Sequence, residues 1–344
     1  MKKWKYMAVY TTPFLVALSI YLPGWWSYTA LVVLFGVVPG LELFTKASTA
    51  NLNEVEEREV LKDRSYDWIL YGLVPLQFIV LTYFLLVIQQ PIPFYEWLGN
   101  VTAMGLACGV IGINAAHELG HRLTKYEQNM SKVLLLTSLY MHFFIEHNRG
   151  HHKHVSTDED PASAKYGESL FAFQLRSISG SWLSAWKLEA QQLKRQGHSF
   201  WSWHNEMLRF QTIQLLFLAV IGVVFGGQAL LAFLAAAMIG ILLLETVNYI
   251  EHYGLRRKKT ERGYERTMHI HSWNSNHPIG RLLLLELSRH SDHHYVASRK
   301  YPILRHFDDS PQMPTGYPGM MLLAAIPPLW FSVMHRRILP KSEI

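Results

Sequence analysis

Residues 117–154 read HELGHRLTKYEQNMSKVLLLTSLYMHFFIEHNRGHHKH and contain seven of the 18 histidines of the chain. His117 and His121 have the spacing H-x-x-x-H, which puts both imidazoles on one face of a helix, close enough to hold one metal ion. His147, His151 and His152 repeat the pattern with an adjacent pair added. Neighbouring residues of a helix point about 100° apart, so one ion cannot easily bind both His151 and His152. The stretch therefore predicts two metal ions.

The segment HELGH alone has another interpretation. H-E-x-x-H on a helix is the zinc-protease signature, with Glu118 as general base, and it also occurs by chance. The second pattern, H-x-x-x-H-H, makes chance a poor explanation, and it leaves His142 and His154 as the expected bystanders. Imidazole binds iron, zinc, copper and nickel alike, so ligand type does not choose the metal.

A third cluster follows much later in the chain. Downstream of an apolar run come NYIEHYG with His252, HIHSWNSNH, and RHSDHHY with His290, His293 and His294. The last of these again has adjacent imidazoles. Because each cluster lies near the end of an apolar run, long helices could bring them together just below a membrane.

Composition indicates a membrane protein, since 50% of the 344 residues are hydrophobic and only 17% are charged. The net charge of +6 suits anionic lipid or an acidic protein partner, and with so apolar a sequence these outrank nucleic acid. Cys108 is the single cysteine, which excludes disulfides and cysteine-ligated iron or zinc centres within this sequence.

We expect an all-α membrane protein forming one domain over residues 1–344, with six transmembrane helices and a histidine-rich helical cap. A helix needs about 20 residues to cross the hydrocarbon, so the run 210–250 must fold back at Gly226-Gly227. Lys residues precede the first helix, and Lys and Arg lie in the second connection, whereas the first and third connections contain neither. This asymmetry places the termini and the cap, residues 117–207 and 251–344, in the cytoplasm. The expected helices are 6–22, 28–44, 68–88, 97–116, 208–225 and 228–250. Val133–Ile145 is too short to cross, and Gly319–Val333 is interrupted by Pro327-Pro328 and predicts an interfacial or core helix.

HELGH, EHNRGHH and RHSDHH resemble the three histidine boxes of the membrane fatty-acid desaturases and hydroxylases. NYIEHYG, HSWNSNH and LRHFDDSPQMPTGYP are similar to segments of the alkane 1-monooxygenases, a non-haem diiron family. The resemblance implies two iron ions with O2 as co-substrate, hydroxylation of medium- or long-chain n-alkanes to 1-alkanols, and a bacterial inner membrane. It also implies electrons from rubredoxin, which rubredoxin reductase reduces with NAD(P)H. The implied iron ligands are His117, His121, His147, His151, His152, His252, His290, His293 and His294.

Residues beside these histidines are expected to support them, because a ligating imidazole usually has its other nitrogen anchored. The carboxylates adjacent to the boxes are Glu118, Glu146, Glu251 and Asp292, and His269 and His271 are further supporting candidates.

Two surfaces are also expected. Trp25, Trp26, Phe35 and Leu41 are candidates for the far wall of an alkane pocket among the helices. The basic stretch 256–266 could dock an acidic electron donor, although the positive-inside bias alone would also place cations there. The docking candidates are Arg256, Arg257, Lys258, Lys259, Arg299 and Lys300.

Other functions are also compatible with the sequence. A related hydroxylase or desaturase would act on xylene-type methyl groups or fatty acyl chains. An intramembrane zinc protease would leave six clustered histidines unexplained, and a metal transporter would carry its polar residues midway along the helices.

Overall fold

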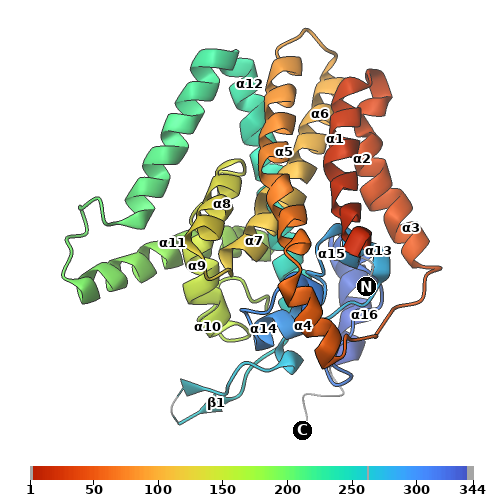
Figure 1. Cartoon of the computed structure of the whole chain (residues 1–344), viewed down its shortest axis with the longest axis vertical. Coiled ribbons are helices and arrows are strands. Elements are labelled where there is room, and N and C mark those ends of the chain that lie inside the picture. The colour runs from red at the N-terminus through yellow and green to blue at the C-terminus, as the bar shows by residue number, and fades with distance from the viewer. Residues whose placement is uncertain (1–2, 262, 339–344) are drawn as a thin grey trace.

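The computed structural model describes residues 3–261 and 263–338, and nearly all of its regular structure is helical (Figure 1). Within these residues the strands are limited to the hairpin of β1 (Lys259–Thr260) and β2 (Gly263–Tyr264), which projects from the lower end of the molecule as drawn.

Among the described residues, four helices are long and apolar enough to cross a membrane: Gly24–Glu42, Ser65–Val87 (α5), Phe94–Gly120 and Glu206–His252 (α12). Two of them contain π turns. The first comprises the turn Gly24–Tyr28, α2 (Thr29–Val32), the π turn Val33–Val37 and α3 (Val38–Glu42). The third comprises α6 (Phe94–Ala107), the π turn Cys108–Ile113 and α7 (Asn114–Gly120).

The 47 residues of α12 form two arms that meet at Gly226, whose φ of 84° and ψ of 170° are not helical. Figure 1 shows the first arm rising to this point and the second returning toward the cap. Phe217 and Phe233 pack between the arms with ring centroids 5.6 Å apart. The predicted reversal at Gly226-Gly227 is confirmed, because a glycine supplies the positive φ that the sharp bend requires.

The first predicted span differs from expectation. Residues Lys3–Tyr10 form a 3-10 helix, and α1 (Thr11–Tyr21) has 11 residues, which is too short to be a crossing by itself. Pro13 lies in the first turn of α1, where its missing N–H is tolerated. Because a proline disfavours the α conformation for the residue before it, Pro13 opposes extension of α1 toward the N-terminus. Within the described residues the structure therefore confirms a helical protein with four or five candidate spans, and the six expected crossings stay a prediction.

The C-terminal apolar stretch forms α15 (Tyr317–Ala324) and α16 (Pro327–Ile338), and the chain bends by 119° between these two helices. Pro327-Pro328 cannot continue the preceding helix, which explains the break. Trp330 of α16 packs against Tyr249 of α12, with ring centroids 5.2 Å apart.

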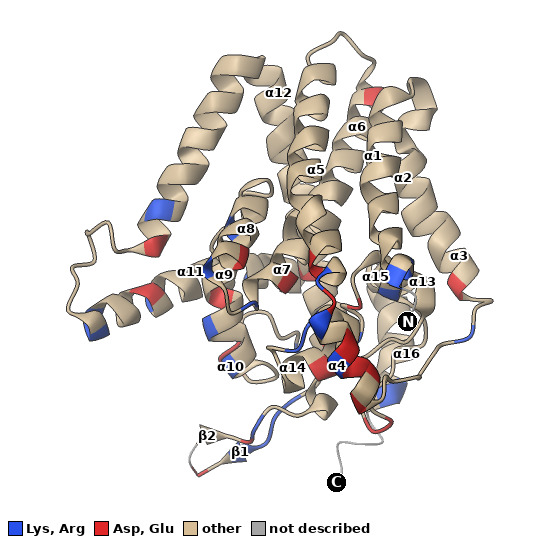
Figure 2. Ribbon diagram, in the orientation of Figure 1, with Lys and Arg blue, Asp and Glu red and all other residues tan. Residues whose placement is uncertain are grey.

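The remaining helices gather at the lower end, where most charged residues lie, while the upper helices are almost free of charge (Figure 2). The remaining helices are α4 (Glu54–Lys62), α8 (Lys125–Leu136), α9 (Phe143–Glu146), the π turn His147–His151, α10 (His152–His154), α11 (Leu170–Gln196), the 3-10 turn His269–His271, α13 (Pro278–Leu283), α14 (His290–Tyr295) and the 3-10 turn Tyr301–Ile303.

Candidate metal centre

The structure brings the nine histidines of the boxes together in two groups. Within each group, one nitrogen of every imidazole lies within 4.8 Å of the others. Group 1 contains His117, His121, His147, His152 and His293, and group 2 contains His151, His252, His290 and His294.

Four separate segments supply these side chains. α7 ends with the first box, the π turn His147–His151 and α10 carry the second, α12 ends at His252, and α14 carries the third. Each adjacent pair is divided, because His151 and His294 belong to group 2 while His152 and His293 belong to group 1. The angular separation of neighbouring helical residues requires this division, and it sets the two groups side by side.

The Nε2 atoms converge inside each group. In group 1 the Nε2 atom of His117 lies 2.9 Å from that of His293, and that of His121 lies 3.0 Å from that of His147. In group 2 the Nε2 distance is 3.2 Å between His151 and His294. Imidazole nitrogens so close together can share a cation, and two groups of four or five nitrogen donors fit transition-metal ions.

Most of these histidines are held neutral, which is the form that binds a metal. Burial lowers the pKa of His121 to about 3, with the neighbouring His151 contributing. Burial, together with the neighbouring imidazoles, keeps the pKa well below its usual range at His147, His152, His290, His293 and His294. His151 differs: burial opposes its charge, but the carboxylates of Asp160, Glu146 and Glu245 together outweigh burial and raise its pKa.

Asp160 is a supporting residue that sequence reasoning missed. Its Oδ2 lies 2.9 Å from Nδ1 of His151 and accepts a hydrogen bond from Ser163, and both the aspartate and the histidine are buried. A carboxylate on Nδ1 directs Nε2 toward the metal position. The sequence signal was weak, since Asp160 stands nine residues after His151 in a loop with two other acidic residues.

The carboxylates predicted to support the boxes lie in different surroundings. Glu118 pairs with Arg122 at 2.9 Å and accepts the backbone N–H of Tyr301, and Asp292 pairs with Arg299 at 2.6 Å. Both carboxylates therefore form ion pairs with arginine side chains. Glu146 is buried, and its Oε1 has no hydrogen-bond partner among the described residues.

Glu251 is the predicted carboxylate that meets a histidine of the two groups. Its Oε2 lies 3.1 Å from Nε2 of His290, and its Oε1 accepts a hydrogen bond of 2.6 Å from the hydroxyl of Tyr317. The contact is with the nitrogen that faces the metal position, so Glu251 stands at the site itself.

Four histidines that the sequence analysis singled out, as bystanders or supporting candidates, lie outside the two groups. His269 contacts Asp309 and stacks on Phe307. Nε2 of His271 lies 3.2 Å from Oε1 of Glu265. His154 pairs with Glu159, and the ring of His142 packs edge-on against that of Tyr140.

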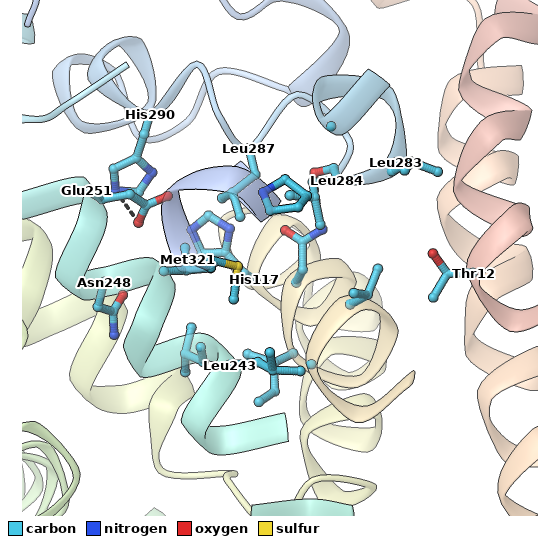
Figure 3. A pocket seen from close by; sticks show the side chains of 18 of the residues that line it. Thr12, His117, Leu243, Asn248, Glu251, Leu283, Leu284, Leu287, His290 and Met321 are labelled. Atoms are coloured by element: carbon cyan, nitrogen blue, oxygen red, sulfur yellow. Dashed lines mark hydrogen bonds and ion pairs between the residues drawn. The ribbon is translucent and has the colours of Figure 1, made fainter. Parts of the chain in front are cut away.

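An apolar cavity opens beside the groups (Figure 3). Its polar end includes His117, His147, His290 and Glu251. Its apolar wall comes from the π turn Val33–Val37, the π turn Cys108–Ile113, α12, α13 with the segment that follows it, and α15. The residues are Leu34, Phe35, Val110, Ile113, Leu243, Leu244, Val247, Leu283, Leu284, Leu287 and Met321. π turns are rare and are enriched at functional sites.

Of the predicted far-wall residues, Phe35 lies in this cavity wall. The other three are on the surface: Trp25 is 74% exposed, Trp26 68% and Leu41 50%. Trp25 stacks on Tyr95, near the turn between the apolar helices. Outward-facing aromatic residues at helix ends are typical of a membrane interface, which accounts for their position.

Several predicted docking residues have structural partners. Arg299 binds Asp292, Lys300 binds Asp67 at 3.0 Å, and the guanidinium of Arg257 donates to the carbonyls of Lys153 and Glu265. Lys259 is exposed in the hairpin, and Arg256 is 3.9 Å from Asp158.

Together, apolar helices and two buried histidine groups define an integral membrane protein with two adjacent candidate metal sites.

Comparison with known proteins gives the family. Residues 95–336 match the fatty acid desaturase family. The chain is 41% identical to alkane 1-monooxygenase 1 of Pseudomonas aeruginosa, over 92% of this chain and 84% of the relative. It is 38% identical to the alkane 1-monooxygenase of Ectopseudomonas oleovorans, over 98% and 86%, and 32% identical to the xylene/toluene monooxygenase hydroxylase component of Pseudomonas putida, over 69% and 63%. The chain belongs to the fatty acid desaturase family, in the branch of the alkane 1-monooxygenases, and the predicted resemblance is confirmed.

Proposed function

We propose that this protein hydroxylates the terminal methyl group of medium- or long-chain n-alkanes with O2 to give 1-alkanols. The observation that carries the proposal is that both histidine groups adjoin one apolar cavity, through His117 and His147 of group 1 and His290 of group 2. A substrate without polar atoms needs such a wall, and its methyl end would lie beside the metal positions.

Two iron ions would be held by the nine histidines, one ion by each group. Bound iron supplies the O2-dependent oxidation, and the protein supplies position and surroundings. Asp160 orients His151, the cavity wall aligns the alkane, and the apolar helices exclude water from the site.

The cavity favours a neutral hydrocarbon over a free fatty acid. Its described lining contains no lysine or arginine to pair with a carboxylate. Xylene-type substrates remain the alternative, since one relative is named for xylene and toluene.

The geometry does not support a zinc protease. Glu118 would have to be a free general base, but it pairs with Arg122 and accepts the N–H of Tyr301. A protease site would also need three ligands from the protein rather than nine clustered histidines.

We further propose that residues 1–344 form one domain in the bacterial inner membrane, with six crossings and the two groups on the cytoplasmic side. Support comes from the position of Lys and Arg around the first helices and from the charged lower end of the molecule. Reduced rubredoxin would deliver the electrons, as the family resemblance implies.

Turnover by the iron-loaded protein tests the proposal. Purified protein is supplied with reduced rubredoxin, O2 and either n-octane or dodecane, and products are separated by gas chromatography. We expect 1-octanol and 1-dodecanol, with one O2 consumed per alcohol. Hydroxylation of a xylene methyl group or of a fatty acyl chain, without any alkanol, would contradict the alkane assignment.

A further inference from the structure

The cavity wall carries one hydroxyl that the alkane reaction does not use. Thr12, in the first turn of α1, lines the cavity and is fully buried. In Figure 3 it lies on the opposite side of the cavity from Glu251 and His290, with its side chain directed toward the other lining residues. The cavity thus has the histidines at one end and a single hydroxyl at the other.

This hydroxyl has no hydrogen-bond partner among residues 3–261 and 263–338. A helical threonine often donates to the carbonyl four residues earlier; here that residue, Ala8, belongs to the preceding 3-10 helix, and the bond is not made. The other polar side chains of the wall, apart from the histidines, do have partners: Asn114 donates to the carbonyl of Leu284, Asn248 to Glu245, and Glu251 accepts from Tyr317.

A buried hydroxyl without a partner costs free energy, and an n-alkane cannot relieve that cost. A chain that ends in a neutral oxygen can. A carboxylate is disfavoured, because the described lining offers it no cation. A primary alcohol fits best, since it both donates and accepts a hydrogen bond.

We propose that the cavity also accepts 1-alkanols, with the hydroxyl bound by Thr12 and the methyl end at the histidines, and converts them to α,ω-diols. This inference rests on the proposed function of the same site. In the reaction a methyl C–H bond breaks and a C–O bond forms. One oxygen atom of O2 enters the diol and the other leaves as water, with two protons and with two electrons from the same rubredoxin-type carrier.

The orientation has a kinetic consequence. An alkanol made from an alkane has its new hydroxyl at the histidine end, so it must leave the cavity and return reversed before the second hydroxylation. Diol therefore appears only after free alkanol has accumulated.

A competition assay with n-decane and 1-decanol tests the role of Thr12. The wild type is compared with Thr12→Val, which keeps the shape and removes the hydroxyl, and with Thr12→Ser, which keeps the hydroxyl. We expect Thr12→Val to lower the specificity for 1-decanol relative to n-decane about tenfold, the size of one hydrogen bond, and Thr12→Ser to retain it. Thr102→Val is the matched control, because that threonine is outside the cavity wall and binds the carbonyl of Leu98.

Two results would overturn the inference: wild type that makes decanol from decane but no diol from decanol, or a Thr12→Val variant whose ratio equals that of the wild type. Wild type that makes no decanol from n-decane would instead refute the proposed function.

Discussion

Nδ1 of His151 and Oδ2 of Asp160 lie 2.9 Å apart, and neither side chain is exposed by more than 3%. Such a carboxylate fixes which nitrogen of the imidazole carries the proton and raises its basicity as a ligand. We predict that Asp160→Asn weakens metal binding by group 2 about 10- to 100-fold. Metal content after titration with a chelator measures the effect. Asp158→Asn is the control, because that side chain is in the same loop and 76% exposed; equal metal loss in the two variants would contradict the role of Asp160.

Phe35 is the far-wall candidate that the cavity retains. We predict that Phe35→Ala lengthens the cavity and shifts the accepted n-alkanes toward longer chains, because the wall limits how far the chain extends from the histidines. Product profiles with alkanes of increasing length measure the shift. Trp25→Ala should leave the profile unchanged, since Trp25 is on the surface. An unchanged profile in Phe35→Ala would remove Phe35 from the substrate path.

Acid should destabilise the metal-free protein. Burial keeps the pKa of His121 at about 3 and those of His147, His152, His290, His293 and His294 below the usual 6.5. Below about pH 6.5 the unfolded chain binds protons at these positions and the folded chain does not, so stability falls as the pH drops. For each histidine, the free energy of unfolding falls by at most about 1.4 kcal/mol per pH unit. His151 acts in the opposite sense, because Asp160 raises its pKa.

Thermal unfolding of metal-free protein in detergent at pH 7.5 and pH 5.5 measures this effect. We expect a lower midpoint at pH 5.5. Replacing Asp160 by Asn should make the fall steeper, because it removes the carboxylate that contacts His151 and favours its charged form. Equal midpoints at both pH values would show that the groups open to water when the metal is absent.

The exposed hairpin allows a sharper test of donor docking. Arg257 holds the carbonyls of Lys153 and Glu265, so its reversal would disturb the fold as well as the surface. We predict that reversing Lys258 and Lys259 to Glu slows rubredoxin-driven turnover, most at low ionic strength, because complementary charge steers an acidic donor. Reversal of Lys194 and Arg195, at the end of α11, is the matched control. Wild-type turnover at limiting rubredoxin in the hairpin variant would place the donor elsewhere.

The sequence predicted what depends on local spacing. The reversal at Gly226 followed from an apolar run too long for one crossing, and the division of the adjacent histidines followed from helical geometry. Contacts between distant segments that no histidine motif marks were not predictable. Asp160 reaches His151 only because the loop after α10 folds back, and Leu34 meets Leu283 in one cavity wall although 249 positions separate them. The sequence predicts Trp25 and Trp26 in the cavity wall, but the structure has both on the surface. The type of residue alone does not show whether an aromatic side chain near a helix end faces lipid or the protein interior.

We propose that each histidine group holds one iron ion. Anomalous diffraction at the iron absorption edge, from crystals of the iron-loaded protein, would locate these ions. We predict two iron positions per chain, one bound by His152 and His293 with the rest of group 1, and the other by His151 and His294 with the rest of group 2. A single metal position, a zinc edge in place of iron, or both members of an adjacent pair on one ion would contradict the account.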